Sequence, residues 1–170
     1  MQPASGSRAA SDSISGREML RHTVTTLAYR GGKALRGAPP EFANFRAGPG
    51  TRTPGEILAH LGDLLDWALS IARGAQEWRS SVLLPWEQGV ARFFAALEAL
   101  DSYLASEAPL GCSPAQMFQG PVADGLTHVG QISMLRRLAG FPVRAENFFR
   151  AEIQTGRVGA DQAAPKREFD

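Results

Sequence analysis

The sequence predicts an all-α protein, a four-helix bundle, on three observations. Four segments of about twenty residues repeat apolar side chains at the spacing of an amphipathic helix. No segment alternates apolar and polar residues as a strand does, and no internal repeat is present. The 170 residues are 44% hydrophobic and 21% charged, which suits one domain with its own core. We therefore expect a disordered N-terminal arm (1–12), a bundle (13–153) and a loosely held C-terminal tail (154–170).

The first helix is expected to begin after Ser15, because Ser15 and Glu18 have the spacing of a capping box. His22 lies nearly opposite the apolar stripe of this helix. We therefore expect His22 to face solvent, and the alternative is a second surface beside a neighbouring helix. The stripe consists of Leu20, Val24, Leu27, Ala28 and Leu35.

The second helix follows a long Gly- and Pro-rich connection, residues 37–52, whose Phe42 and Phe45 we expect to lie over the end of the bundle. It should begin at Thr53, which is followed by proline and, three residues on, by glutamate. His60 sits on the flank of the apolar stripe of this helix. On its own, such a residue is more often a structural histidine than a metal ligand.

The third helix should open at Pro85 and serve as scaffold, because its apolar stripe contains no candidate ligand. Its acidic residues Glu98 and Asp101 fall beside the stripe or outside it, so we expect them to face solvent. A further capping pattern begins at Ser113 and predicts a short helical turn before the fourth long helix.

The fourth helix, residues 120–140, carries the polar residues of most interest. Asp124 and His128 are one turn apart, so their Cβ atoms lie roughly 5–6 Å from each other and their side chains can converge on one ion. The alternative is a buried, hydrogen-bonded histidine without a ligand. In helical bundles, metal ligands project inward from facing helices, and His60 would complete a three-ligand open site.

Composition excludes several classes of partner and location. The net charge of +1 comes from scattered basic residues, which argues against a nucleic-acid partner. Cys112 is the single cysteine, so an intramolecular disulfide is excluded and a reducing compartment is favoured. No signal peptide or membrane-spanning apolar run is visible. We expect a cytoplasmic protein without a membrane partner.

Two segments, TPGEILAHLGDLLDWAL (53–69) and LTHVGQISMLRRLAG (126–140), resemble the DinB/YfiT-like metalloenzyme family. The resemblance spans most of residues 15–140, and it implies a homodimer of four-helix bundles with a long connection between helices 1 and 2. In that family a divalent metal is held by a histidine of the second helix and a His-x-x-x-His pair of the fourth. His60 matches the first of these ligands and His128 the last, while Asp124 stands where the pair begins.

Two imidazoles and one carboxylate with open positions suit iron(II), zinc or another borderline ion such as nickel, so the metal identity stays open. His22 could replace Asp124 only if the first helix turned its weaker face inward, and we rank it lower. The surplus apolar residues Phe45, Phe148 and Phe149 also suit a homodimer.

The resemblance implies a metal-dependent transferase or isomerase that activates a low-molecular-weight thiol as thiolate. Cys112 carries no mark of a nucleophile. Arg136 or Arg137 could contact an anionic substrate, or both could be exposed surface charges. Two other classes stay open: a metal- or ligand-binding protein without turnover, and a structural or interaction bundle whose histidines only pack.

Overall fold

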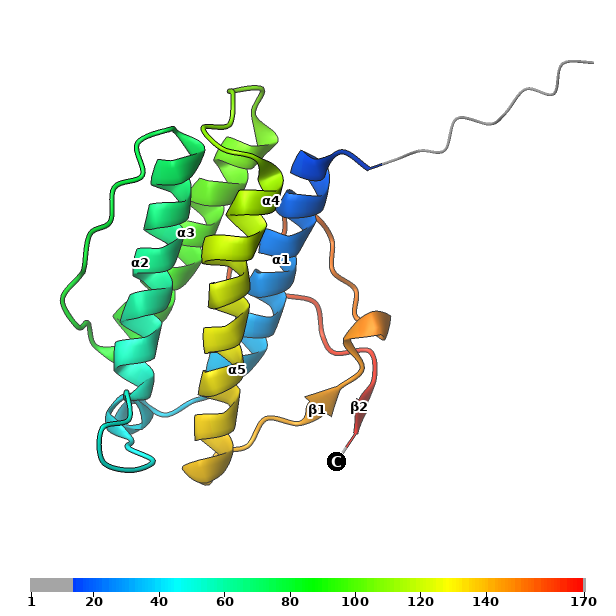
Figure 1. The fold of residues 1–170 in the computed structure, drawn as a ribbon. Helices are drawn as coiled ribbons and strands as arrows, with labels where there is room; N and C mark the ends of the chain where they lie inside the picture. Colours follow the sequence, from blue (N-terminus) through cyan, green and yellow to red (C-terminus); the bar gives the residue numbers. More distant parts are fainter. Residues whose placement is uncertain (1–13, 170) are drawn as a thin grey trace, which may run out of the picture.

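The computed structural model describes residues 14–169 and is mostly helical. Four long helices lie side by side around one core (Figure 1). They are α1 (Gly16–Leu35), α2 (Pro54–Ala72), α3 (Trp86–Ala105) and α5 (Ala123–Leu138). The shorter elements are η1 (Pro40–Asn44), α4 (Pro114–Met117), η2 (Phe118–Val122), β1 (Ala145–Glu146), η3 (Phe148–Arg150) and β2 (Glu168–Phe169). The all-α prediction is confirmed, and the only strands in the described part of the chain are two residues long.

The long helices run as two parallel pairs, α1 with α5 and α2 with α3 (Figure 1). The connection after α2 returns along the length of the bundle, so that α3 points in the same direction as α2 (Figure 1). Arg92 of α3 accordingly donates a hydrogen bond to the carbonyl oxygen of Ala59 in α2. Gly89, one turn earlier in α3, lies beside Leu58. This return connection, residues 73–85, passes over the outer face of α2 and contributes to the site described below.

Three helix starts follow the predicted chemistry. Ser15, Thr53 and Ser113 each accept a hydrogen bond from the backbone N–H three residues on, and the side chain of that third residue accepts one from the cap. These capping boxes satisfy two backbone donors at each helix end. The predicted starts of α1, α2 and α4 are confirmed.

The start of the fourth long helix differs from the prediction. The chain passes from α4 through a wide turn, η2, and α5 begins at Ala123 instead of Gly120. Gly120 has non-helical dihedrals (φ −89°, ψ −107°), and Pro121 follows it without an N–H to donate. The hydrogen-bond ladder is therefore interrupted, and α4 and α5 form one kinked helical segment.

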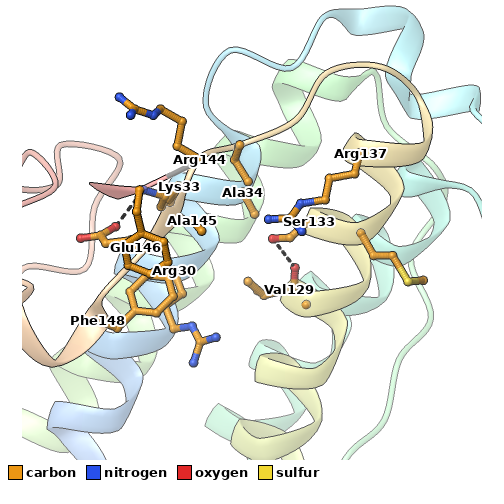
Figure 2. A pocket seen from close by; sticks show the side chains of 14 residues that line it. Arg30, Lys33, Ala34, Val129, Ser133, Arg137, Arg144, Ala145, Glu146 and Phe148 are labelled. Atoms are coloured by element: carbon orange, nitrogen blue, oxygen red, sulfur yellow. Dashed lines mark hydrogen bonds and ion pairs between the residues drawn. The ribbon is translucent and has the colours of Figure 1, made fainter. Parts of the chain in front are cut away.

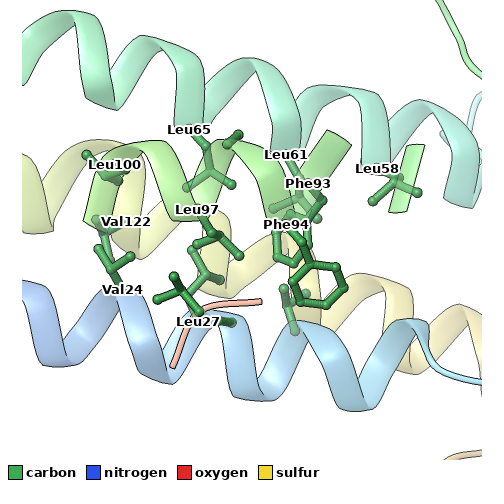
Figure 3. Close-up of a cluster of buried hydrophobic side chains, with 14 of the residues drawn as sticks. Val24, Leu27, Leu58, Leu61, Leu65, Phe93, Phe94, Leu97, Leu100 and Val122 are labelled. Atoms are coloured by element: carbon green, nitrogen blue, oxygen red, sulfur yellow. The ribbon is translucent and has the colours of Figure 1, made fainter. Parts of the chain in front are cut away.

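The bundle core is made of side chains from all four long helices (Figure 3). Leu27, Leu61, Leu97 and Ile132 are fully buried, and burial of each such side chain contributes about 1.5–3 kcal/mol. Phe42 closes one end of this core, with its ring 5.4 Å from that of Trp86. The expectation that the first connection covers the end of the bundle is confirmed for Phe42.

Two residues expected at the surface are buried. Asp101 is only 5% exposed, because Arg21 of α1 donates two hydrogen bonds to its carboxylate, at 2.8 and 3.1 Å. Arg136 is 6% exposed and donates to the carbonyl oxygens of Ala34 and Arg36, at the end of α1. The solvent assignment of Asp101 was wrong, and so was the interpretation of Arg136 as an exposed surface charge, since its guanidinium caps a helix.

The C-terminal segment packs along α1. β1 and β2 pair antiparallel, and Glu146 of β1 accepts hydrogen bonds from Tyr29 at 2.6 Å and from Lys33 at 2.9 Å. Burial and the bond to Glu146 raise the pKa of Tyr29, which keeps its hydroxyl protonated as the donor. Val158 is also buried, a contact that the sequence did not predict.

The domain division itself stays a prediction, and residues 1–12 lie outside the described part of the chain. None of the helices within residues 14–169 combines the length and the apolar character needed to cross a bilayer.

Candidate metal site

The structure brings His60, Asp124 and His128 together between α2 and α5. One candidate ligand atom from each residue lies within 4.8 Å of the other two. Within residues 14–169 this is the one group of three or more His, Cys, Asp and Glu side chains with such geometry. The two helices place the group differently: Asp124 and His128 share a face of α5 by their i, i+4 spacing, while His60 faces them from α2.

The distances between the donor atoms suit a shared ion. His60 Nε2 lies 3.7 Å from Asp124 Oδ2, and His128 Nε2 lies 3.4 Å from Asp124 Oδ1. Ligands bonded at about 2.1 Å around a tetrahedral ion are separated by about 3.4 Å. Both His–Asp distances are therefore close to the ligand spacing around a zinc-sized ion, and each histidine faces a different oxygen of the Asp124 carboxylate.

The same distances are long for direct hydrogen bonds, for which nitrogen and oxygen approach to about 2.7–3.2 Å. Within the described residues, His60 makes no hydrogen bond through its ring, and the ring of His128 makes one, on Nδ1. The alternative interpretation of hydrogen-bonded structural histidines thus accounts for one nitrogen of the four in the two rings.

Gln131 holds the ring of His128. Its Oε1 lies 2.8 Å from His128 Nδ1, so the ring donates from Nδ1 and its Nε2 lone pair points toward Asp124 and His60. A ligating histidine usually donates its second ring N–H to an oxygen in this way, which fixes its tautomer and orientation. Gln131 lies on the flank of the predicted helix face, but its bond to His128 was not predicted.

The connection between α2 and α3 packs against one member of the group, His60. The Trp78 ring lies 5.6 Å from that of His60 and 5.7 Å from that of Trp67, and the His60 and His128 rings meet edge to face at 4.7 Å. Trp78 was missed in the sequence because no periodic pattern marks its connection.

Burial in this packing lowers the pKa of His60, and electrostatic interactions with His128 and Arg52 act in the same direction. The neutral imidazole, the form that binds metals, is thereby favoured. Access to solvent remains through Asp124, whose side chain is 46% exposed, compared with 23% for His60 and 11% for His128. The group is partly buried and open on the carboxylate side.

Other residues considered from the sequence lie elsewhere. His22 is exposed and contacts Thr155, with Nδ1 3.2 Å from the hydroxyl oxygen, so the solvent interpretation is confirmed. Cys112 is half-buried, and burial raises the pKa of its thiol, which opposes a nucleophilic role. Arg137 is exposed on α5 and lines a different cavity.

Comparisons of the chain with protein-family models, with curated proteins and with solved structures found no match. The resemblance to the DinB/YfiT-like family therefore stays an expectation. The class of protein is defined by the fold and the site alone: a helical bundle with a two-histidine, one-carboxylate group between two of its helices.

Proposed function

We propose that the protein binds one divalent metal ion through His60, Asp124 and His128. The observation that carries this proposal is the convergence of three donor atoms at ligand spacing from two helices, with no hydrogen bonds between them. Zinc, nickel and iron(II) all accept two imidazoles and a carboxylate, so the donor set fits the group without selecting one metal.

The proposed reaction class is transfer or isomerisation with a small thiol as nucleophile. Three protein ligands leave at least one coordination position of the ion open. A thiol that occupied this position would have its pKa lowered by the divalent ion. Asp124 would reduce the net charge of the site, and Trp78 would limit access of water beside His60. This reaction class rests on the family resemblance and on the open coordination position.

The metal content of protein purified without an affinity tag tests the first proposal. Wild type should contain about one divalent ion per chain, and His60→Ala, Asp124→Ala and His128→Ala should each lower this content, because a ligand and its pre-organised geometry are lost. His22→Ala is the matched control, since His22 is an exposed histidine of another helix. Full metal content in His60→Ala and His128→Ala would refute the site.

Replacement of Asp124 by histidine gives a second test of the ligand assignment. If Asp124 occupies the place of the first histidine of the family pair, Asp124→His should retain one metal ion and shift the preference among zinc, nickel and iron(II). Competition between these ions under anaerobic conditions would measure the shift. An Asp124→His protein without metal would contradict the assignment.

Activity measurements separate the three classes of function. Thiol-dependent turnover that requires metal supports the enzyme. Stoichiometric metal without turnover across thiols and electrophiles favours a binding protein, and absence of metal from wild type favours an interaction bundle.

We also propose a homodimer, on the family resemblance and on exposed apolar side chains such as Phe149, which is 92% exposed. A monomer mass by light scattering over a wide range of concentrations would refute it.

A further inference from the structure

A cavity of about 440 Å³ lies between α1, α5 and the C-terminal segment (Figure 2). Its α5 wall is formed by Val129, Ser133 and Arg137, which follow one another every four residues. At 100° per residue, Arg137 projects about 180° away from His128 around the helix axis. The cavity and the metal site therefore occupy opposite faces of α5, and a ligand in one cannot reach the other.

Some of the cations that line this cavity already have acidic partners. Lys33 lies between the carboxylates of Glu146 and Glu168, and its Nζ is 2.9 Å from Glu146 Oε2. Arg144 lies 3.8 Å from Glu168. These pairs hold the C-terminal segment on α1 and form the back of the cavity.

Two other guanidinium groups at the cavity have no carboxylate partner within residues 14–169, those of Arg30 and Arg137. Figure 2 shows Arg137 reaching from α5 toward α1 beside Ser133. The Ser133 hydroxyl donates its proton to the carbonyl oxygen of Val129, so Arg137 is the group on this wall that can donate to a ligand. A guanidinium without a counter-charge at a cavity favours an anionic ligand.

The rest of the lining is apolar and held in place. The rings of Phe148 and Tyr29 meet edge to face, with their centroids 6.3 Å apart, and the Arg30 guanidinium lies over the Phe148 ring, 4.5 Å from its centroid. Met134 and Phe169, at the rim, are 56% and 48% exposed. A ligand with an apolar body would remove this surface from water.

We propose that the cavity binds a small amphipathic organic anion, with its anionic group on Arg137 and its apolar body between Met134 and Phe148. The volume lies within the ~300–1,000 Å³ of small-molecule sites, which combine an apolar lining with a few polar groups that fix orientation. This site is independent of the metal proposal, because no lining residue belongs to the metal group.

Titration of octanoate into the metal-free full-length chain, followed by amide chemical shifts in NMR spectra, tests the proposal. Octanoate should bind saturably and shift the amides of Ser133, Ala145 and Phe148. Octanol, which lacks the charge, and inorganic phosphate, which lacks the apolar body, should each bind at least tenfold more weakly. No saturation by octanoate, or equal affinity for octanol or phosphate, would overturn the proposal.

Two variants locate the binding in this cavity. Arg137→Gln should weaken octanoate about tenfold or more, because a charge-assisted hydrogen bond is lost. Arg79→Gln is the control, since the Arg79 side chain is 84% exposed in the connection between α2 and α3. Unchanged affinity in Arg137→Gln would place the ligand elsewhere.

Gly130→Leu should block the cavity. A Cβ at Gly130 meets no heavy atom within 4 Å, and leucine favours a helix more than glycine does, so this variant should fold. Loss of octanoate binding with an unchanged or higher melting temperature supports the site, and retained binding contradicts it.

Discussion

Helix α2 carries two polar side chains one turn apart, Asp63 and His60, and only Asp63 forms hydrogen bonds. Asp63 faces α3, where Arg92 donates to it at 2.8 Å and the backbone N–H of Ser81 donates at 3.2 Å. His60 faces α5 and makes no hydrogen bond within the described residues, although candidate metal-ligand atoms of Asp124 and His128 lie near it. Proximity of polar groups therefore does not by itself distinguish a structural pair from a ligand set.

The two groups differ in whether their side chains are complementary in charge and in hydrogen bonding. A carboxylate and a guanidinium are complementary, and the Arg92–Asp63 and Arg21–Asp101 pairs bring the two into hydrogen-bond contact. Two imidazoles in the form that binds a metal and a carboxylate would all present lone pairs to the same point, and a cation is what completes such a group. The first kind of group should affect the stability of the protein, and the second kind should affect its affinity for metal.

The largest expected effect on stability belongs to the Asp63 pair. Arg92→Met should lower the free energy of unfolding of the metal-free protein by about 3 kcal/mol, because it leaves a buried carboxylate with only a backbone donor. Urea denaturation would measure the change, and metal affinity should stay near that of wild type. Arg79→Met, at an exposed position, should change stability by less than about 0.5 kcal/mol. Equal stabilities of the two variants would show that the Arg92–Asp63 pair does not stabilise the fold.

The metal group should contribute to stability only when metal is present. A free zinc concentration of about one hundred times the dissociation constant should raise the free energy of unfolding of wild type by about 2.7 kcal/mol. His128→Ala should show no such increase, whereas His22→Ala should match wild type. Thermal unfolding with and without EDTA would show the difference. An equal metal-dependent shift in His128→Ala would mean that the ion binds at another place.

A smaller effect should follow from the residue that orients His128. Gln131→Leu removes the acceptor of the Nδ1 proton and should weaken metal binding by about tenfold, or about 1.4 kcal/mol. Gln131→Glu keeps an acceptor and should retain most of the affinity. Ser133→Ala, on another face of the same helix, serves as the control in a competition titration with a chelator. Wild-type affinity in Gln131→Leu would assign Gln131 a packing role alone.

The smallest effect is expected at Cys112. If the protein catalyses a thiol-dependent reaction, Cys112→Ser should leave the rate and the metal content unchanged, because burial raises the pKa of this thiol and keeps it protonated. The assay would compare Cys112→Ser with His128→Ala in metal-loaded protein with added thiol. Loss of turnover in Cys112→Ser with full metal content would reject the proposed source of the nucleophile.

The helix starts and the pairing of Asp124 with His128 could be predicted from the sequence because the interactions involved are local. A capping box joins Thr53 to a residue three positions on, and a helix places residues four positions apart on one face. The kink at Gly120 was missed although its cause is local, since Pro121 can also begin a helix. Local sequence thus determined the elements and the candidate ligands.

The burial of the polar residues and the identity of their partners were decided by the tertiary structure. Asp101 is buried because Arg21, eighty positions away in the sequence, reaches it from α1, and Arg136 is buried because it caps the far end of the same helix. Periodicity shows which face of a helix a residue occupies, but not which side chain of another helix meets it. His60 was connected to α5 by the general architecture of helical bundles and by a family resemblance, not by any local pattern. Its Nε2 lies 3.7 Å from the Asp124 carboxylate because packing of the apolar stripes sets the position of α2 against α5.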